Sequence, residues 1–141
     1  MTVFRANTTS YCWTFDNVLW YSTQTELRNY NLATNTDTLK RSLTHAYGDI
    51  AWAADGKLYG IEYLSFTNPA PQTFASVQNA NPTLYRLYQI DPVAGTETLI
   101  YSGNDIAYGN SLSSDNKNWL YFGSGLRQGG TGPFTTGKAQ M

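Results

Sequence analysis

The chain has 141 residues, a length that usually folds as a single domain. Charged residues make up 13% of the sequence, aromatic residues 15%, and the formal net charge is −1 at pH 7. Nucleic acid is excluded as a partner of the usual kind, because no basic stripe is present to neutralise phosphates. No stretch approaches the roughly 20 apolar residues of a membrane span, and the N-terminus lacks the apolar core of a signal peptide, so we expect a soluble protein.

The first predicted element is a β-hairpin over Tyr11–Ser22, where two aromatic-rich runs flank an Asp-Asn turn. The same sequence motif recurs at Ile50–Ile61. The two copies align without a gap, with Trp13 opposite Trp52. A looser third copy, SLSSDNKNWLYFGS, occupies Ser111–Ser124. A sequence motif that recurs in this way predicts a fold built from structural repeats.

A second hairpin is predicted after each of the first two. Segment 25–43 has strand-like runs around the turn ATNT, and segment 83–103 has them around DPVAG. The Asp-Pro start and the Gly end of DPVAG are strong turn signals, because proline presets φ and glycine supplies a positive φ. Two hairpins in succession predict a four-stranded antiparallel sheet in each repeat.

The spacing of the copies indicates the size of the repeat. Tyr11 and Ile50 lie 39 residues apart, close to the roughly 40 to 50 residues of one four-stranded propeller blade. The third copy follows after about 60 residues, and segment 64–82, which contains three prolines and no alternation, accounts for the excess as a long loop.

The stretches DIAWAADGKLYGIE and LYRLYQIDPVAGTETLI resemble the repeats of β-propellers of the NHL, YWTD and WD-like kind. The resemblance implies an all-β fold of antiparallel four-stranded propeller-type blades over residues 1–125, with blades at 10–43 and 46–103 and a partial blade at 104–125. Complete propellers hold about 4 to 8 blades. We therefore expect an incomplete ring that is completed by oligomerisation or docking, followed by a Gly/Thr-rich C-terminal tail, 126–141, without a blade strand.

No catalytic group is predicted. His45 is the only histidine and lies in a polar connection between blades, and Cys12, the only cysteine, lies in an apolar run. A metal site made of His and Cys is excluded by count. The Gly-rich segment 129–132 lacks the lysine and the strand-to-helix setting of a phosphate loop, so no cofactor is expected.

Recurring aspartates are the candidate polar groups. Asp16, Asp55 and Asp115 fall at the hairpin turns, where we expect each side chain to bond its own backbone. Asp49 and Asp105 precede the predicted innermost strands, a position that in propellers often faces the central funnel, where copies could form an acidic ring that holds a cation. Hydrogen bonding to the neighbouring blade is the favoured interpretation of these two.

Three phenylalanines lie outside the repeats. Phe66 and Phe74 are in the long loop and Phe134 is in the tail, so they are candidate contacts for a partner. The alternative is that each segment folds back over its own sheet.

The sequence-based hypothesis of function is a non-enzymatic structural or binding protein within a larger assembly, such as a surface or decoration component of a virion. Its partners would be copies of itself or a larger protein assembly. The alternative hypothesis is an oligomeric lectin-like propeller, because aromatic rings beside Asn and Thr suit stacking on a glycan.

Overall fold

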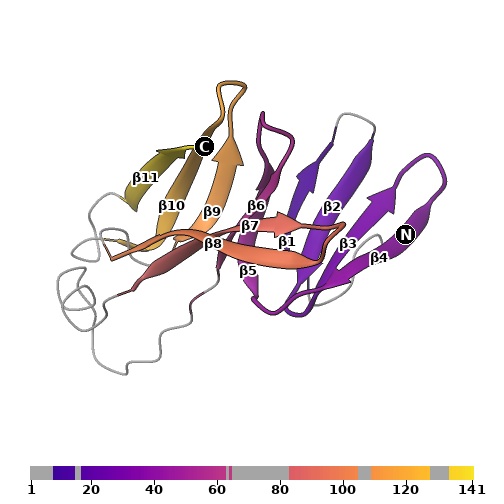
Figure 1. Cartoon of the computed structure of the whole chain (residues 1–141), viewed down its shortest axis with the longest axis horizontal. Helices are drawn as coiled ribbons and strands as arrows, with labels where there is room; N and C mark the ends of the chain where they lie inside the picture. Colours follow the sequence, from indigo (N-terminus) through magenta and orange to yellow (C-terminus); the bar gives the residue numbers. More distant parts are fainter. Residues whose placement is uncertain (1–7, 15–16, 63, 65–82, 105–108, 128–133) are drawn as a thin grey trace.

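The computed structural model describes residues 8–14, 17–62, 64, 83–104, 109–127 and 134–141. Within these ranges the chain forms eleven β-strands and no helix, arranged in three antiparallel sheets that lie side by side (Figure 1). This confirms the predicted fold class. None of the described residues forms a helix that is long and apolar enough to cross a membrane.

The first two sheets are four-stranded and follow the order of the chain. Blade 1 consists of β1 (Thr8–Trp13), β2 (Val18–Thr23), β3 (Glu26–Asn31) and β4 (Thr36–Ser42). Blade 2 consists of β5 (Tyr47–Trp52), β6 (Leu58–Glu62), β7 (Tyr85–Asp91) and β8 (Thr96–Gly103). Each blade is thus the pair of successive hairpins that the sequence predicts.

The third sheet, blade 3, contains one more strand than the sequence indicates. It consists of β9 (Gly109–Ser114), β10 (Trp119–Arg127) and β11 (Phe134–Gln140), with β10 in the middle. The prediction that the C-terminal tail carries no blade strand is therefore wrong. The segment FTTGKAQ has no apolar alternation to mark it as a strand, and the free edge of β10 supplies the backbone partners that make it one.

The strand registers give corresponding residues in the three blades. Cys12 pairs with Trp20, Ala51 with Tyr59, and Ser113 with Tyr121, each pair joining the first strand of a blade to the second. Because residues directly opposite each other share a face, these pairs mark the same face of each blade. We call it the trailing face, since it looks toward the following blade. The opposite face, which looks toward the preceding blade, is the leading face.

Two apolar clusters hold the blades together. The trailing face of blade 1 packs on the leading face of blade 2 through one cluster: Leu27, Leu43, Tyr47, Ile50, Leu58, Tyr88 and Ile90, with Cys12, Trp20 and Trp52 against it. The trailing face of blade 2 packs on blade 3 through the other: Ala51, Ala53, Tyr59, Ile61, Tyr85, Leu87, Leu112, Leu120 and Phe122. The hydrophobic core therefore lies between the sheets, and the first strands lie against one another, β5 beside β1 and β9 beside β5.

Candidate functional site

The β5–β6 and β9–β10 turns lie at the same end of their blades (Figure 1). Asp55 Oδ1 accepts a hydrogen bond from the backbone N–H of Lys57 at 3.0 Å, and Asp115 Oδ1 accepts one from that of Lys117 at 2.8 Å. Gly56 takes a φ of 78° in the first of these turns, a value that favours glycine. The expected role of Asp55 and Asp115 in their own turns is therefore confirmed, whereas Asp16 lies outside the described residues.

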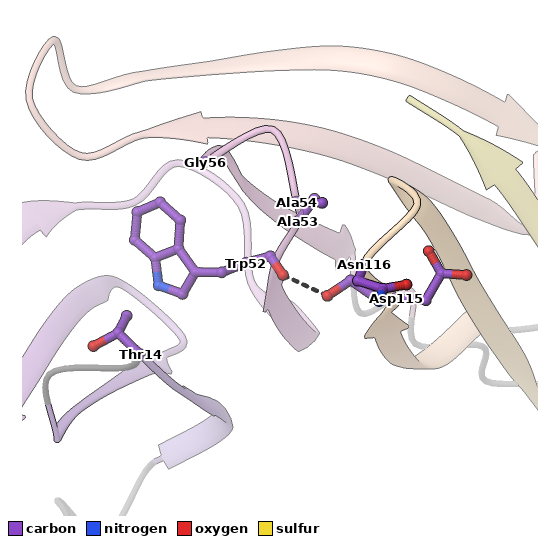
Figure 2. A pocket seen from close by; sticks show the side chains of 8 residues that line it. Thr14, Trp52, Ala53, Ala54, Gly56, Asp115 and Asn116 are labelled. Atoms are coloured by element: carbon purple, nitrogen blue, oxygen red, sulfur yellow. Dashed lines mark hydrogen bonds between the residues drawn. The ribbon is translucent and has the colours of Figure 1, made fainter.

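A groove of about 650 Å³ runs across this end of the three blades. It is lined by residues from all three blades: Thr14 from blade 1, Trp52, Ala53, Ala54 and Gly56 from blade 2, and Ser114, Asp115 and Asn116 from blade 3. Figure 2 shows the indole of Trp52 extending toward Thr14, with Asp115 and Asn116 on the other side. The packing of three repeats thus brings together a site that no single repeat contains.

Trp52 is the large apolar side chain of the groove. Its ring packs edge-on against Trp20 at a centroid distance of 5.4 Å, and its backbone carbonyl accepts a hydrogen bond from Ser114 Oγ. The side chain is half-buried, while Nε1 is buried and makes no hydrogen bond within the described part of the chain. An unsatisfied buried N–H is unfavourable by about 1–3 kcal/mol, so the ring is held here by packing and not by a polar contact.

Asp115 is the charged side chain that lines the groove. The backbone N–H of Trp119 donates to it at 3.0 Å, and together with the Lys117 N–H and the Tyr121 hydroxyl this lowers the pKa of its carboxyl. The group is therefore an ionised acceptor whose oxygens already hold the turn. It can accept hydrogen bonds from hydroxyl groups, but it is poorly suited to act as a general base.

A second polar cluster surrounds His45. Its Nδ1 donates to Glu62 Oε1 at 3.0 Å, Glu62 Oε2 accepts from Arg86 at 2.9 Å, and the imidazole stacks on Tyr88 at 4.2 Å. Glu62 thus orients the imidazole through Nδ1, which is the arrangement of a base oriented by a carboxylate. From the sequence, a surface or turn role is favoured for His45 over that of a general base. The sequence did not reveal its partners, because Glu62 and Arg86 are distant in the chain.

The His45 cluster and the groove belong to opposite ends of blade 2. Glu62 is at one end of β6, and Leu58, which pairs with Trp52, is at the turn end. Four steps along a strand correspond to about 13 Å at roughly 3.3 Å per residue. The two groups therefore do not form one site.

Asp49 joins blade 2 to blade 3. Its Oδ2 accepts from the backbone N–H of Leu112 at 2.9 Å and its Oδ1 from that of Ile50 at 3.0 Å. Burial outweighs these bonds and raises the pKa of the carboxyl. This geometry agrees with the favoured interpretation, hydrogen bonding to the neighbouring blade.

In blade 3 the register place of Asp49 is taken by a described residue of β9. Asp105 lies outside the described residues, before β9 begins at Gly109. The residue of β9 in the register place of Asp49 is Ser111, since Asp49 pairs with Ile61 and Ser111 with Gly123. That Asp105 faces a central funnel together with Asp49 stays a prediction, since Asp105 is outside the part of the chain that the structure describes.

The remaining candidate residues from the sequence, three phenylalanines and a cysteine, add no side chain to the described lining of the groove. Phe66 and Phe74 lie outside the described residues, and Phe134 opens β11 with a side chain that is not described. Cys12 packs half-buried in the interface of blades 1 and 2, where burial raises the pKa of its thiol to about 12, so it is an inert core residue. Within the described ranges, no three His, Cys, Asp or Glu side chains gather in a way that could hold a metal ion.

The fold resembles solved structures of oligogalacturonate lyases, which are β-propeller proteins. An oligogalacturonate lyase from Vibrio parahaemolyticus matches with a TM-score of 0.52 and 19% identity, over 77% of this chain and 30% of that one. An oligogalacturonate lyase in complex with manganese matches with a TM-score of 0.50 and 20% identity, over 76% of this chain and 30% of that one. No protein-family model and no curated protein matches the sequence. The likeness shows a propeller-type fold without assigning a repeat family.

These findings correct the sequence-based hypothesis of function. A non-enzymatic protein, whether a virion component or a lectin-like ring, was expected because no catalytic motif is visible, yet the solved structures that share the fold are enzymes. Nothing in the comparisons supports a virion or a lectin. The chain spans about a third of the length of these lyases, so an activity of this chain is a matter for proposal.

Proposed function

We propose that this chain supplies blades of a β-propeller enzyme that acts on oligosaccharides of uronic acids, and that the groove at the hairpin turns holds part of the sugar chain. The observation that carries the proposal is the composition of the groove: one half-buried indole among the hydroxyl, amide and carboxylate groups of Thr14, Ser114, Asn116 and Asp115.

This composition suits a saccharide. A sugar ring presents a C–H face that packs on an aromatic ring and a rim of hydroxyl groups that both donate and accept hydrogen bonds. Trp52 offers the aromatic surface, and the side chains of blade 3 offer the donors and acceptors. A site with an apolar wall and a few polar groups is also the ordinary form of a small-ligand site.

The preference for uronic acids is supported by the named substrate of the two lyases and by a lysine in each of the two turns beside the groove. The β5–β6 turn carries Asp55 and Lys57, and the β9–β10 turn carries Asp115 and Lys117, so the formal charges of the two turns cancel. Both lysines are exposed, and either could pair with the carboxylate of a uronic acid at the rim of the groove.

The chemical step would come from elsewhere in the ring. Asp115 is committed to its turn, and His45 lies at the other end of blade 2. The manganese of one neighbour is not carried over, because the described side chains do not gather the donors of a metal site. In this proposal the chain binds and orients the substrate, and further blades supply the base that removes a proton.

The test is calorimetric titration of the chain with trigalacturonate, with cellotriose as the neutral comparison. Asn116→Ala removes an exposed groove side chain that makes no hydrogen bond within the described ranges, and Trp52→Phe shortens the aromatic wall; both should weaken binding at least five-fold. Tyr101→Ala, which removes an exposed ring on β8 outside the groove, is the matched control and should bind as the wild type does. Equal affinity of all three variants would refute the groove as the site.

A further inference from the structure

The side-chain amide of Asn118 joins three segments of the chain. Asn118 is the last residue of the β9–β10 turn, and its Oδ1 accepts a hydrogen bond from the backbone N–H of Asp55 at 3.0 Å. Its Nδ2 donates to the backbone carbonyl of Met141, the residue after β11, at 2.6 Å. Oxygen meets a donor and nitrogen meets an acceptor, so the amide has one defined orientation. It connects the turn of blade 2, the turn of blade 3 and the end of β11.

The backbone of the turn explains an asparagine here, but it does not explain these contacts. The φ angle is 66° at Asn118, 78° at Gly56 and 61° at Asn17, which hold the same place in their blades. Glycine and asparagine adopt this left-handed conformation most readily. The side chain of Asn17, however, makes no hydrogen bond within the described ranges. The contacts of Asn118 with other segments are therefore an addition to what the turn requires.

The two turns that Asn118 joins form facing walls of the groove. Each contributes three lining residues: Ala53, Ala54 and Gly56 from the β5–β6 turn, and Ser114, Asp115 and Asn116 from the β9–β10 turn. The bond from Ser114 to the carbonyl of Trp52, drawn in Figure 2, joins the walls where the strands end. The bond from Asp55 to Asn118 joins them at the turns themselves. Asn118 is not a lining residue, so it can act on the groove only through the two turns.

Other hydrogen bonds of the β5–β6 turn stay within its own hairpin. The Gly56 N–H donates to the carbonyl of Ala53, and the Lys57 N–H donates to the side chain of Asp55. Such bonds fix the shape of the turn, but they do not fix its distance from blade 3. Because exposed turns with few packed contacts open at a low free energy, a bond to a neighbouring blade decides where the turn lies.

Met141 anchors the other end of the amide. Its side chain is partly buried against the apolar cluster between blades 2 and 3, and its N–H donates to the backbone carbonyl of Asn118 at 2.9 Å. The strand before it, β11, pairs with β10 from Gln140 to Phe134. Asn118 therefore links an exposed turn to a segment that packing and a backbone ladder hold in place.

We infer that Asn118 is a positioning residue of the groove, because its amide holds the β5–β6 turn of blade 2 against blade 3. The consequence for saccharide binding rests on the proposed function. The position of the turn does not, since it follows from hydrogen bonds within the chain.

The test compares Asn118→Gly with Asn17→Gly. Glycine keeps a residue that adopts a positive φ at both places, so each variant reports the loss of the side chain alone. Without ligand, hydrogen exchange at the Asp55 amide should be roughly five-fold faster in Asn118→Gly, the factor expected for the loss of one hydrogen bond. The amide signals of Ala53–Gly56 should shift as well. Asn17→Gly is the matched control and should change neither, and circular dichroism melts establish that both variants are folded.

Asn118→Asp keeps an oxygen that can accept from the Asp55 N–H, so exchange there should stay within about two-fold of the wild type. An Asp55 amide that exchanges at the wild-type rate in Asn118→Gly, or equally fast in both Asn118 variants, would overturn the inference.

Calorimetric titration with trigalacturonate then tests the effect on the groove. Asn118→Gly should bind about three-fold more weakly or worse, because the freed turn must be ordered on binding, whereas Asn17→Gly should bind as the wild type does. Unchanged affinity in Asn118→Gly would overturn the positioning role. If the wild type itself does not bind the sugar, the proposed function fails, and the exchange and shift measurements still decide whether Asn118 holds the turn.

Discussion

The ring of Tyr47 lies directly on the Cα of Gly60. A Cβ added at Gly60 would stand 2.5 Å from Cδ1 of that ring, closer than any real contact allows. The tyrosine crosses the leading face of blade 2 over β6 and donates from its hydroxyl to Glu97 on β8 at 2.7 Å. The absence of a side chain at position 60 is thus what lets the ring of Tyr47 cross β6 and reach the carboxylate of Glu97.

Gly60→Ala should destabilise the fold by about 1–3 kcal/mol, the usual effect of overpacking a dense core. Chemical denaturation followed by tryptophan fluorescence measures it. In a Tyr47→Leu background the ring that collides with the new methyl group is gone, so the same substitution should lose most of its effect. Equal destabilisation in both backgrounds would show that the contact is not responsible.

Glu97 should make the stability of the fold depend on pH in the acid range. Its carboxylate accepts from the Thr44 N–H at 2.8 Å, the Thr44 hydroxyl at 2.6 Å, the His45 N–H at 3.2 Å and the Tyr47 hydroxyl. Burial acts to raise the pKa of this group, but the hydrogen bonds outweigh it and lower the pKa below the ordinary 4.5. Because the pKa is lower in the folded protein, Glu97 contributes fully to the free energy of unfolding above about pH 4.5. This contribution is lost as the pH falls through the pKa of the folded state.

Urea denaturation of the wild type and of Glu97→Gln between pH 7 and pH 3 tests this dependence. The wild type should be the more stable at neutral pH, and the difference should shrink as the pH falls below 4.5. A difference that is constant over the range would mean that the charge of Glu97 is not what holds the connection between blades 1 and 2.

The hydroxyl groups of Tyr59 and Tyr121 provide a matched pair. Tyr59→Phe removes a hydrogen bond beside the core of blades 2 and 3 and should reduce stability by about 1 kcal/mol. Tyr121→Phe removes the corresponding bond on an exposed ring, so its effect on the melting temperature should be much smaller. A comparable loss of stability in the two variants would show that the exposure of the ring does not decide what its hydrogen bond contributes.

Asp49 should protect one backbone amide of the neighbouring blade. Asp49→Ala removes the acceptor of the Leu112 N–H, so hydrogen exchange at Leu112 should become faster by at least ten-fold, while exchange in β2 and β3 stays unchanged. Asp49→Asn keeps an acceptor oxygen and should retain much of the protection. Unaltered exchange at Leu112 in the alanine variant would remove Asp49 from the blade contact.

The repeated hairpins were predictable from the sequence because their signals are local. Alternating aromatic residues and an Asp-Gly or Asp-Asn turn lie within a dozen residues, and Asp55 and Asp115 bond their own turns as expected. Strand β11 escaped prediction, because its seven residues are mostly polar and β10 alone supplies its backbone partners. The third blade was therefore judged shorter than it is.

The candidate site was beyond sequence reasoning for a different reason. Thr14, Trp52 and Asn116 belong to three repeats, and only the packing of the blades brings them to one groove. The repeated tryptophan of the hairpins was a partial signal, since Trp52 occupies the place of Trp13, but alternating aromatic residues favour core packing over ligand contact.

Whether the groove is the saccharide site can be decided by nuclear magnetic resonance. Backbone amide signals would be followed while trigalacturonate is added to the isotope-labelled chain. We expect the largest shifts at Ala53–Gly56 and Ser114–Lys117, with Thr44, His45 and Glu62 unaffected at the opposite end of blade 2. Shifts confined to those three residues and Arg86, or no shifts at all, would contradict the proposal.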